Sequence, residues 1–320
     1  MSAETLENSA APAIGPRDIA GTGVFVSPIG LDGSVFGWAA GMDDTALMLD
    51  SYAAGGGNFI CTADHYSGGR SEIMIGSWLR TMADRDSFVL STRVGKHPDA
   101  EGLSKRSILR AVENSLTRLG TDHIDFLAFE GEDPEVPIDE SLETVDRLIR
   151  EGKVRFLAES GFSADRILEV GVLSAEAAYP DFRALFAEYN LMDRQAYETE
   201  LAPLASLNGR AGLAMLPLAA GYLTAQFRTR DHVPHSVLYE GATRHVGRRG
   251  SRVLDALETV AKELGETPAR IALAWLLVKP GIAAAVLRAK DPDQVAHALG
   301  AADVRLARHH VSALDKASAY

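Results

Sequence analysis

Short apolar runs alternate along this chain with amphipathic segments, and this alternation limits the fold more than any other feature of the sequence. Eight runs are short and mostly apolar, as strands are when both faces of a sheet are covered. They are Ser27–Leu31, Asn58–Cys61, Phe88–Arg93, Ile124–Glu130, Val154–Ser160, Ala184–Tyr189, Leu213–Leu218 and Ile282–Leu287. Each is a predicted strand of one parallel sheet.

The segments between these runs carry helix signals. The clearest extend from Ser104 to Gly120, from Asp139 to Gly152 and from Ser251 to Gly265. Each combines a polar first residue, apolar residues at helical spacing and a closing glycine, which are independent marks of a helix. Eight strands that alternate with helices predict an α/β fold, a closed (β/α)8 TIM barrel, with its chemistry at the carboxyl ends of the strands.

The domain boundaries follow from composition. Residues 1–17 are small, polar and contain proline, which predicts a mobile N-terminal tail. Residues 18–320 are expected to form a single barrel domain. Within it, the stretch 228–249 is polar and basic without clear periodicity, and we expect a long loop over one mouth of the barrel.

Composition also excludes several kinds of site and partner. The 320 residues carry a formal net charge of −12, which argues against a nucleic-acid partner. Cys61 is the single cysteine, so an intrachain disulfide is impossible, and no metal-ligand spacing predicts a metal site. The longest apolar stretches are too short to span a membrane, and no secretory signal opens the chain. We therefore expect a cytoplasmic protein with a small-molecule substrate and no membrane partner, and we leave its oligomeric state open.

The strand ends carry motifs that, taken together, are highly specific. They are VSPIGL (26–31), GGNFI (56–60), TADHYSGGRSE (62–72), NSLTRLGTDHIDFL (114–127), GKVRFLAESGFS (152–163), EYNLMDR (188–194), PLAAGYLT (217–224) and TPARIALAWLLVKPGI (267–282). Through these motifs the chain resembles the aldo-keto reductase superfamily from about residue 23 to its end. The resemblance implies a barrel that binds NADP(H) and reduces carbonyl groups.

The resemblance places a catalytic tetrad of Asp, Tyr, Lys and His, and three of its four positions differ here. Tyr66 keeps the tyrosine that donates a proton to the substrate oxygen. Cys61 stands at the aspartate position, Arg93 at the lysine position and Glu130 at the histidine position. Asp64, two residues before Tyr66, is a different position and is not assigned the aspartate's role.

The positions that hold the cofactor in the family differ as well. The Ser-Asn pair that binds the nicotinamide carboxamide is Ser160-Gly161 here, the glutamine is Phe186 and the stacking aromatic is Met215. Loss of these amides and of the stack weakens nicotinamide binding. In the phosphate loop, Arg288 and Lys290 are the predicted cofactor-binding residues if NADPH binds, together with Ser160. The early Leu-Gly-Thr turn of the family reads Leu31-Asp32-Gly33.

The replaced residues allow alternative chemistries. Arg93 cannot lose its proton, so it acts as a fixed cation that stabilises an oxyanion or lowers the pKa of Tyr66. Glu130 is either a general acid or base with a raised pKa or a carboxylate ionised beside Arg93. Cys61 is either a thiolate stabilised by Arg93 or a small buried apolar residue. His65, Phe186, Met215 and Trp38 are expected to line the substrate pocket.

Three functions follow from these substitutions. The first is cofactor-independent acid/base chemistry (dehydration, elimination, isomerisation or cyclisation) on a carbonyl compound, with Tyr66, Glu130, Arg93 and Cys61 as the catalytic set. The second is an NADPH-dependent carbonyl or enone reductase with an altered tetrad. The third is a non-catalytic sensor or partner protein on the reductase fold, as potassium-channel β subunits partly are. We expect the first function, with no cofactor.

Overall fold

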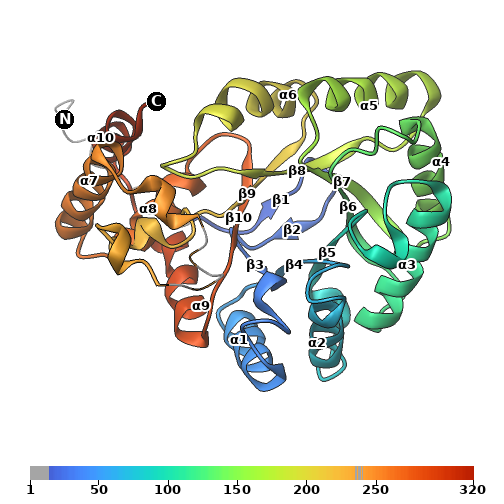
Figure 1. The fold of residues 1–320 in the computed structure, drawn as a ribbon, viewed down its shortest axis with the longest axis horizontal. Coiled ribbons are helices and arrows are strands. Elements are labelled where there is room, and N and C mark those ends of the chain that lie inside the picture. The colour runs from blue at the N-terminus through green and yellow to red at the C-terminus, as the bar shows by residue number, and fades with distance from the viewer. Residues whose placement is uncertain (1–13, 235, 237–238, 240) are drawn as a thin grey trace, which may run out of the picture.

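The molecule is built around a closed parallel barrel. A computed structural model describes residues 14–234, 236, 239 and 241–320. Within these residues, eight parallel strands close in the order β10-β3-β4-β5-β6-β7-β8-β9, and helices surround them (Figure 1). The strands are β3 (Ile29–Asp32), β4 (Phe59–Ala63), β5 (Val89–Val94), β6 (Ile124–Glu130), β7 (Val154–Ser160), β8 (Phe182–Glu188), β9 (Ala211–Met215) and β10 (Ile282–Leu287). The predicted (β/α)8 TIM barrel is confirmed.

The helices fill the connections between strands and cover the barrel. They are α1 (Met42–Ala54), α2 (Arg70–Leu79), α3 (Lys105–Leu119), α4 (Ile138–Arg150), α5 (Ala164–Ala177), α6 (Ala202–Leu207), α7 (Arg248–Leu264), α8 (Pro268–Leu277), α9 (Pro292–Leu299) and α10 (Arg308–Ser318). Of the three segments singled out in the sequence, α3 matches at both ends: the Ser104 hydroxyl accepts from the Ser107 backbone N–H at 3.2 Å, and Gly120 is left-handed with φ 65°. The other two start earlier than predicted, at Ile138 and Arg248. No helix in the described ranges is long and apolar enough to cross a bilayer.

Strand β9 starts and ends at earlier residues than predicted, and the position of its C-terminal end affects the site. The apolar run continues to Leu218, yet the strand stops at Met215. Leu216 has a positive φ of 48° and Pro217 has no N–H to donate to a ladder, so the chain turns out of the sheet there. This turn forms one wall of a cavity of about 600 Å³, described below.

A short hairpin, β1 (Arg17–Asp18) with β2 (Phe25–Val26), closes the amino-terminal end of the barrel. Its apolar residues pack with inward-facing side chains of the barrel strands in one cluster. Arg17 donates hydrogen bonds to the carbonyl oxygens of Ile282 and Leu277. The predicted tail is therefore too long at its inner end: Arg17 is part of the fold because it is tied to β10 and α8. Residues 1–13 of that tail lie outside the described residues.

The predicted loop 228–249 is also shorter than expected. Its last two residues begin α7, and single helical turns occur at Arg230–His232 and Ala242–His245. Residues 235, 237, 238 and 240 lie outside the described part of the chain. The basic residues of the stretch are engaged in part, since Arg228 pairs with Asp255 at 2.9 Å and with Glu258 at 2.7 Å on α7.

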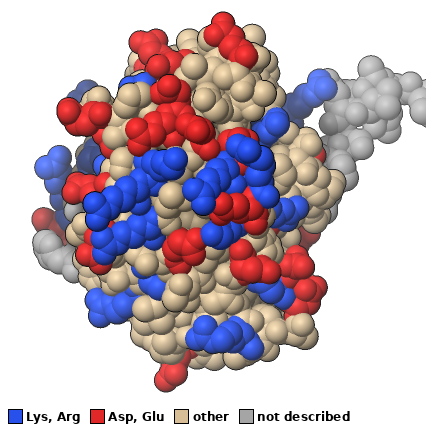
Figure 2. Space-filling view, turned by 90° about the vertical axis from the view of Figure 1, so that its right-hand side faces the viewer, with Lys and Arg blue, Asp and Glu red and all other residues tan. Residues whose placement is uncertain are grey.

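The helical outer layer carries charges of both signs. Figure 2 shows that Lys and Arg side chains interleave with Asp and Glu on the face that includes α3 and α4 in Figure 1. Ion pairs such as Arg147 with Glu151 at 2.7 Å and Lys153 with Glu113 at 2.5 Å belong to these helices and the adjoining loop. Exposed ion pairs of this kind contribute little to the free energy of unfolding, and their charges keep the surface solvated.

Glu159 in β7 is a buried carboxyl group that makes stability depend on pH. It is 1% exposed, and its Oε2 accepts from the backbone N–H of Phe162 at 2.9 Å. Burial raises the pKa of Glu159 to about 8, although that hydrogen bond and the charge of Arg210 lower it. The folded chain therefore keeps a proton that the unfolded chain releases from about pH 4.5 upward, so stability falls as pH rises from 4.5 to about 8.

We expect Glu159→Gln to abolish this fall, because the amide can still accept from Phe162 but cannot ionise. At pH 8 the variant should be more stable than the parent by roughly 1–4 kcal/mol. Urea unfolding at pH 5 and pH 8 measures the difference. Glu176→Gln, an exposed position on α5, serves as the control and should keep the parent's slope. A parent whose stability is level between pH 5 and 8 would contradict this prediction.

Candidate active site

The carboxyl ends of the first four barrel strands bring charged residues to one place. Asp32 ends β3, and its backbone is in register with Cys61 on β4. Arg93 on β5 is in register with Ala63, and Glu130 ends β6 opposite Ser160. Because all strands are parallel, these ends share one mouth of the barrel, as the sequence predicted. Tyr66 lies in the turn that follows β4.

Arg93 and Tyr66 form the centre of this site. Arg93 is only 3% exposed, and its Nη2 donates a hydrogen bond to the Tyr66 hydroxyl. Its guanidinium carbon lies 5.1 Å from the Tyr66 ring centre. Burial raises the pKa of the Tyr66 phenol well above its usual value, Asp32 and Glu130 raise it further, and Arg93 lowers it. Tyr66 therefore keeps its proton at neutral pH beside a permanent cation.

The Arg93 guanidinium also reaches across the mouth. Its Nη1 lies 3.8 Å from the Met215 sulfur, and its central carbon lies 5.6 Å from the ring centre of Phe186. Burial lowers the pKa of Arg93, but the adjacent Tyr66, Asp32 and Glu130 more than offset this and raise it. Phe186 and Met215, both predicted to line the pocket, thus flank the guanidinium.

Glu130 and His65 face each other at the edge of the site. His65 Nδ1 lies 3.3 Å from Glu130 Oε2 and 3.7 Å from Asp64 Oδ1. Glu130 Oε2 is also 3.9 Å from Arg93 Nε, which is ion-pair range without a hydrogen bond. The His65 ring meets the Tyr66 ring edge-on at 4.9 Å. The imidazole of His65, which we expected in the substrate pocket, and the carboxyl group of Glu130 therefore lie together beside Tyr66.

The structure favours the packing alternative for Cys61. The side chain is 1% exposed and belongs to the apolar cluster inside the barrel. Burial raises the pKa of the Cys61 thiol well above its usual value, and the opposing effect of Arg93 is smaller. A thiol that stays protonated is a poor nucleophile. We therefore assign Cys61 to the core of the barrel and not to the reacting groups.

We expected Trp38 to line the substrate pocket, but its side chain is largely exposed. It follows β3 in the loop before α1 and is 69% exposed. Its backbone N–H donates to the Val35 carbonyl oxygen. A side chain this exposed contributes little to enclosing a substrate.

A cavity of about 600 Å³ opens beside this site, between the ends of β9 and β10. The turn after β9 forms one wall with Leu216, Leu218 and Thr224. Arg288, Lys290 and Gln294 form the opposite wall. Tyr66, Arg93 and Glu130 are not among its lining residues, so the predicted residues form two groups: a proton-transfer group at β4–β6 and a basic group at β10. Ser160 ends β7 between Glu130 and Phe186 in the sheet register.

Asp32 is the site residue that the sequence did not single out. It is 1% exposed, and it acts electrostatically on Tyr66, Arg93 and Cys61. One signal was available: an acidic residue directly after the apolar run that ends at Leu31, at a turn where the family has glycine. Strand ends in this fold are where such residues meet.

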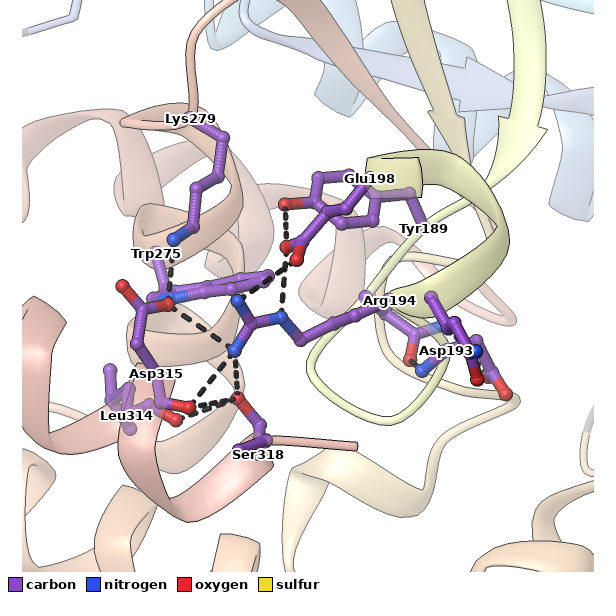
Figure 3. Close-up of polar contacts among 12 residues, drawn as sticks. Tyr189, Asp193, Arg194, Glu198, Trp275, Lys279, Leu314, Asp315 and Ser318 are labelled. Atoms are coloured by element: carbon purple, nitrogen blue, oxygen red, sulfur yellow. Dashed lines mark hydrogen bonds and ion pairs between the residues drawn. The ribbon is translucent and has the colours of Figure 1, made fainter. Parts of the chain in front are cut away.

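Tyr189, which follows β8 directly, has a structural role. Its hydroxyl donates to Glu198 Oε1 at 2.8 Å, and Arg194 Nε donates to the same oxygen at 2.8 Å (Figure 3). Arg194 Nη1 also donates a hydrogen bond to the hydroxyl of Ser318 on α10, at 2.7 Å. The chain after β8 is thereby connected to the C-terminal helix.

A second set of contacts completes this connection. Asp315 Oδ1 accepts from Trp275 Nε1 at 2.8 Å and from Lys279 Nζ at 2.6 Å, as Figure 3 shows. Lys279 Nζ also lies 4.5 Å from the Trp275 ring centre. Helices α8 and α10 are joined through Asp315, so this polar cluster stabilises the fold.

One group of potential metal ligands occurs in the described residues, at Glu263, His309 and His310. His310 Nε2 lies 3.2 Å from Glu263 Oε2, and its Nδ1 accepts from the backbone N–H of Ala307. A histidine that ligates a metal through Nε2 needs Nδ1 as a donor. In His310, Nδ1 accepts a hydrogen bond instead of donating one. The group of Glu263, His309 and His310 therefore joins α7 to α10 and does not suit a metal.

The comparisons with known proteins agree with this geometry. A model of the Aldo/keto reductase family matches residues 29–319. The chain belongs to the aldo/keto reductase family. A curated relative from Schizosaccharomyces pombe, named as a voltage-gated potassium channel subunit beta, is 30% identical over 252 residues, which cover 74% of this chain and 73% of the relative. A relative with the same kind of name from Oryza sativa subsp. japonica is 27% identical over 279 residues, covering 84% and 85%.

Aldo/keto reductase membership implies NADP(H), and the residues present fit one end of that cofactor better than the other. The cavity has the volume of a ligand pocket, and its lining holds two cations that can bond phosphates, Arg288 and Lys290, together with the carboxyl groups of Asp291 and Asp293. At the other end, Ser160 offers a hydroxyl, while Phe186 and Met215 offer apolar surface. The chain therefore offers two cations to the phosphate end of the cofactor, and its nicotinamide end has fewer polar partners than the family's motifs supply.

Proposed function

We propose that this chain is an NADP(H)-dependent reductase of a carbonyl or enone substrate in which Tyr66 is the proton donor. The observation that carries the proposal is the hydrogen bond between Tyr66 and the buried Arg93 at the carboxyl end of the barrel. Family membership over residues 29–319 supports reduction over the cofactor-independent chemistry that we expected from the sequence. The two cations in the cavity lining, Arg288 and Lys290, support a bound dinucleotide over no cofactor.

In this proposal, each residue of the site has a separate role in the reduction. Tyr66 holds its proton strongly, because burial and two carboxylates raise its pKa, so a protonated donor is available over a wide pH range. Arg93 donates to the phenol oxygen and stabilises the negative charge that develops there as the proton leaves. A bound reduced nicotinamide would supply the hydride. His65 and Glu130, 3.3 Å apart, offer a donor and an acceptor that orient the substrate.

Arg288 and Lys290 hold the cofactor's phosphates in this proposal. Charge-assisted hydrogen bonds contribute about 1.5–3 kcal/mol each. We expect Arg288→Ala combined with Lys290→Ala to weaken NADPH binding by roughly 10²- to 10⁴-fold, measured by cofactor fluorescence or calorimetry at constant salt. The control Lys316→Ala removes an exposed positive charge of α10 that is outside the cavity lining and should leave binding unchanged.

The same titration separates the three functions. Saturable NADPH binding together with oxidation of bound NADPH by an added aldehyde or enone supports the reductase. Absence of NADPH and NADP⁺ binding up to millimolar concentration overturns it in favour of cofactor-independent chemistry. Binding without turnover on any carbonyl tested favours the sensor or partner function, which the names of the two relatives also suggest.

A further inference from the structure

The two ring nitrogens of His65 have opposite surroundings. Nδ1 is buried, and it lies 3.3 Å from Glu130 Oε2 and 3.7 Å from Asp64 Oδ1. The side chain is nevertheless 29% exposed, and Nδ1 is not part of that exposed surface. The opposite edge of the ring, which carries Nε2, is therefore the exposed one. One edge of the imidazole faces two carboxyl groups, and the other faces the open side of the site.

The carboxyl groups that face Nδ1 are themselves enclosed. Asp64 is 0% exposed, and neither of its carboxyl oxygens has a hydrogen-bond partner among the described residues. Glu130 Oε2 is also buried, and Arg93 Nε, which always carries a hydrogen, lies 3.9 Å from it. Buried oxygens are destabilising unless a hydrogen is directed at them. Within this group of atoms, Nδ1 is the nearest nitrogen that can direct one at both carboxyl groups.

The place of the hydrogen on the His65 ring follows from this enclosure. A neutral imidazole carries its hydrogen on one of the two nitrogens, and the neighbouring groups decide on which. With the hydrogen on Nε2, the lone pair of Nδ1 would face two carboxyl oxygens within 3.7 Å, and three acceptors would meet in a buried place. With the hydrogen on Nδ1, both contacts are attractive. Nε2 then presents a lone pair to the exposed side.

This lone pair lies beside the proton donor of the site. The His65 and Tyr66 rings meet edge-on, with their centres 4.9 Å apart. Both residues belong to the turn after β4, and Glu130 approaches the imidazole from the end of β6. A substrate whose oxygen reaches Tyr66 therefore has the exposed edge of His65 next to its neighbouring atoms.

We propose that Asp64 and Glu130 are positioning residues that hold the hydrogen of His65 on Nδ1, and that His65 Nε2 accepts a hydrogen bond from the substrate. The substrate class that satisfies Nε2 is a carbonyl compound with a hydroxyl or N–H group next to the reacting carbon. A compound without that donor leaves Nε2 unpaired when it displaces water from the site. The substrate class rests on the proposed reductase function, whereas the place of the hydrogen does not.

The first test is ¹⁵N NMR of the whole protein, labelled in its histidine rings, at about pH 8. The signals that disappear in His65→Gln are those of His65. We expect Nδ1 at the shift of a ring nitrogen that carries hydrogen and Nε2 at the shift of one that does not, the reverse of the form that predominates in free neutral histidine. Hydrogen on Nε2 in the parent overturns the proposal.

Glu130→Gln tests the positioning role by the same measurement. The amide keeps the size of the side chain but can turn an N–H toward Nδ1, so we expect both shifts of His65 to move toward those of free histidine. Glu135→Gln removes a charge from an exposed residue of the same loop and should leave the shifts unchanged. Equal shifts of His65 in Glu130→Gln and in the parent overturn the role of Glu130.

The second test compares reduction of hydroxyacetone and butan-2-one with NADPH, two ketones that differ by a hydroxyl in place of a methyl group. We expect the ratio of their kcat/KM values to be about 3- to 10-fold higher in the parent than in His65→Asn, a comparison that cancels their intrinsic reactivity. His65→Gln places a polar atom near the position of Nε2 and should keep the parent's ratio, whereas His65→Asn places one near Nδ1.

Two outcomes of the second test count against separate claims. Equal ratios in the parent and in His65→Asn overturn the substrate class. Reduction of neither ketone counts against the reductase function. The NMR measurement needs no cofactor or substrate, so it supports or overturns the place of the hydrogen on His65 in either case.

Discussion

Tyr66→Phe should lower kcat for carbonyl reduction by about 10²- to 10⁴-fold, the usual contribution of a positioned proton donor. The phenylalanine ring keeps the shape of the site but removes the hydroxyl to which Arg93 donates. NADPH affinity should stay within about twofold of the parent, because Tyr66 is outside the lining of the cavity in which we propose that the phosphates bind. Steady-state kinetics and cofactor titration on the same preparation measure both quantities.

Tyr197→Phe is the matched control for this experiment. Tyr197 is also buried, at 3% exposure, and its hydroxyl has no hydrogen-bond partner among the described residues. Its removal should leave kcat unchanged. If Tyr66→Phe retains the parent's kcat at saturating NADPH, another group donates the proton and the assignment of Tyr66 is wrong.

Arg118→Leu should be the most destabilising single change we foresee, costing about 3–5 kcal/mol in the free energy of unfolding. Arg118 Nε donates to Glu72 Oε2 at 2.6 Å, and Glu72 is 0% exposed on α2. Without Arg118, the buried Glu72 carboxyl loses its cation and keeps neutral partners such as the Thr92 hydroxyl, which donates to Oε1 at 2.6 Å. Thr92 precedes Arg93, so the same contact locates the strand end that carries the site. Urea unfolding at pH 7.5 measures the loss.

The pH dependence of this loss follows from Glu72. Burial raises the pKa of its carboxyl, while Arg118 and Thr92 lower it. Removal of Arg118 raises that pKa further, so the folded variant takes up a proton more readily than the unfolded chain. The destabilisation should therefore be greatest at neutral pH and shrink as pH falls and Glu72 becomes protonated.

Arg147→Leu is the contrasting control for the ion pair. Arg147 and Glu151 form an exposed pair at 2.7 Å on α4. Its loss should leave stability unchanged within error. Equal effects of Arg118→Leu and Arg147→Leu would show that burial of Glu72 does not govern the stability of α2.

The sequence determined the barrel and the place of its chemistry. Eight apolar runs of strand length between helical segments admit one common closed architecture, and parallel strands bring their carboxyl ends to one mouth. Tyr66, Arg93 and Glu130 could be placed together on that ground alone. Ser104 and Gly120 located α3 at both ends because capping depends only on neighbouring residues.

The tertiary structure determined which side chains come close together and which are buried. Asp32 at the end of β3 acts on Tyr66 in the turn after β4, His65 lies 3.3 Å from Glu130, and Arg93 reaches Met215, a residue 122 positions away in the chain. Cys61 is a core residue because the barrel encloses it, although the sequence also allowed a thiolate beside Arg93. Arg17 belongs to the fold through carbonyls of α8 and β10. Periodicity and capping are local and can be read along the chain, whereas desolvation and the pairing of charges arise only when distant segments meet.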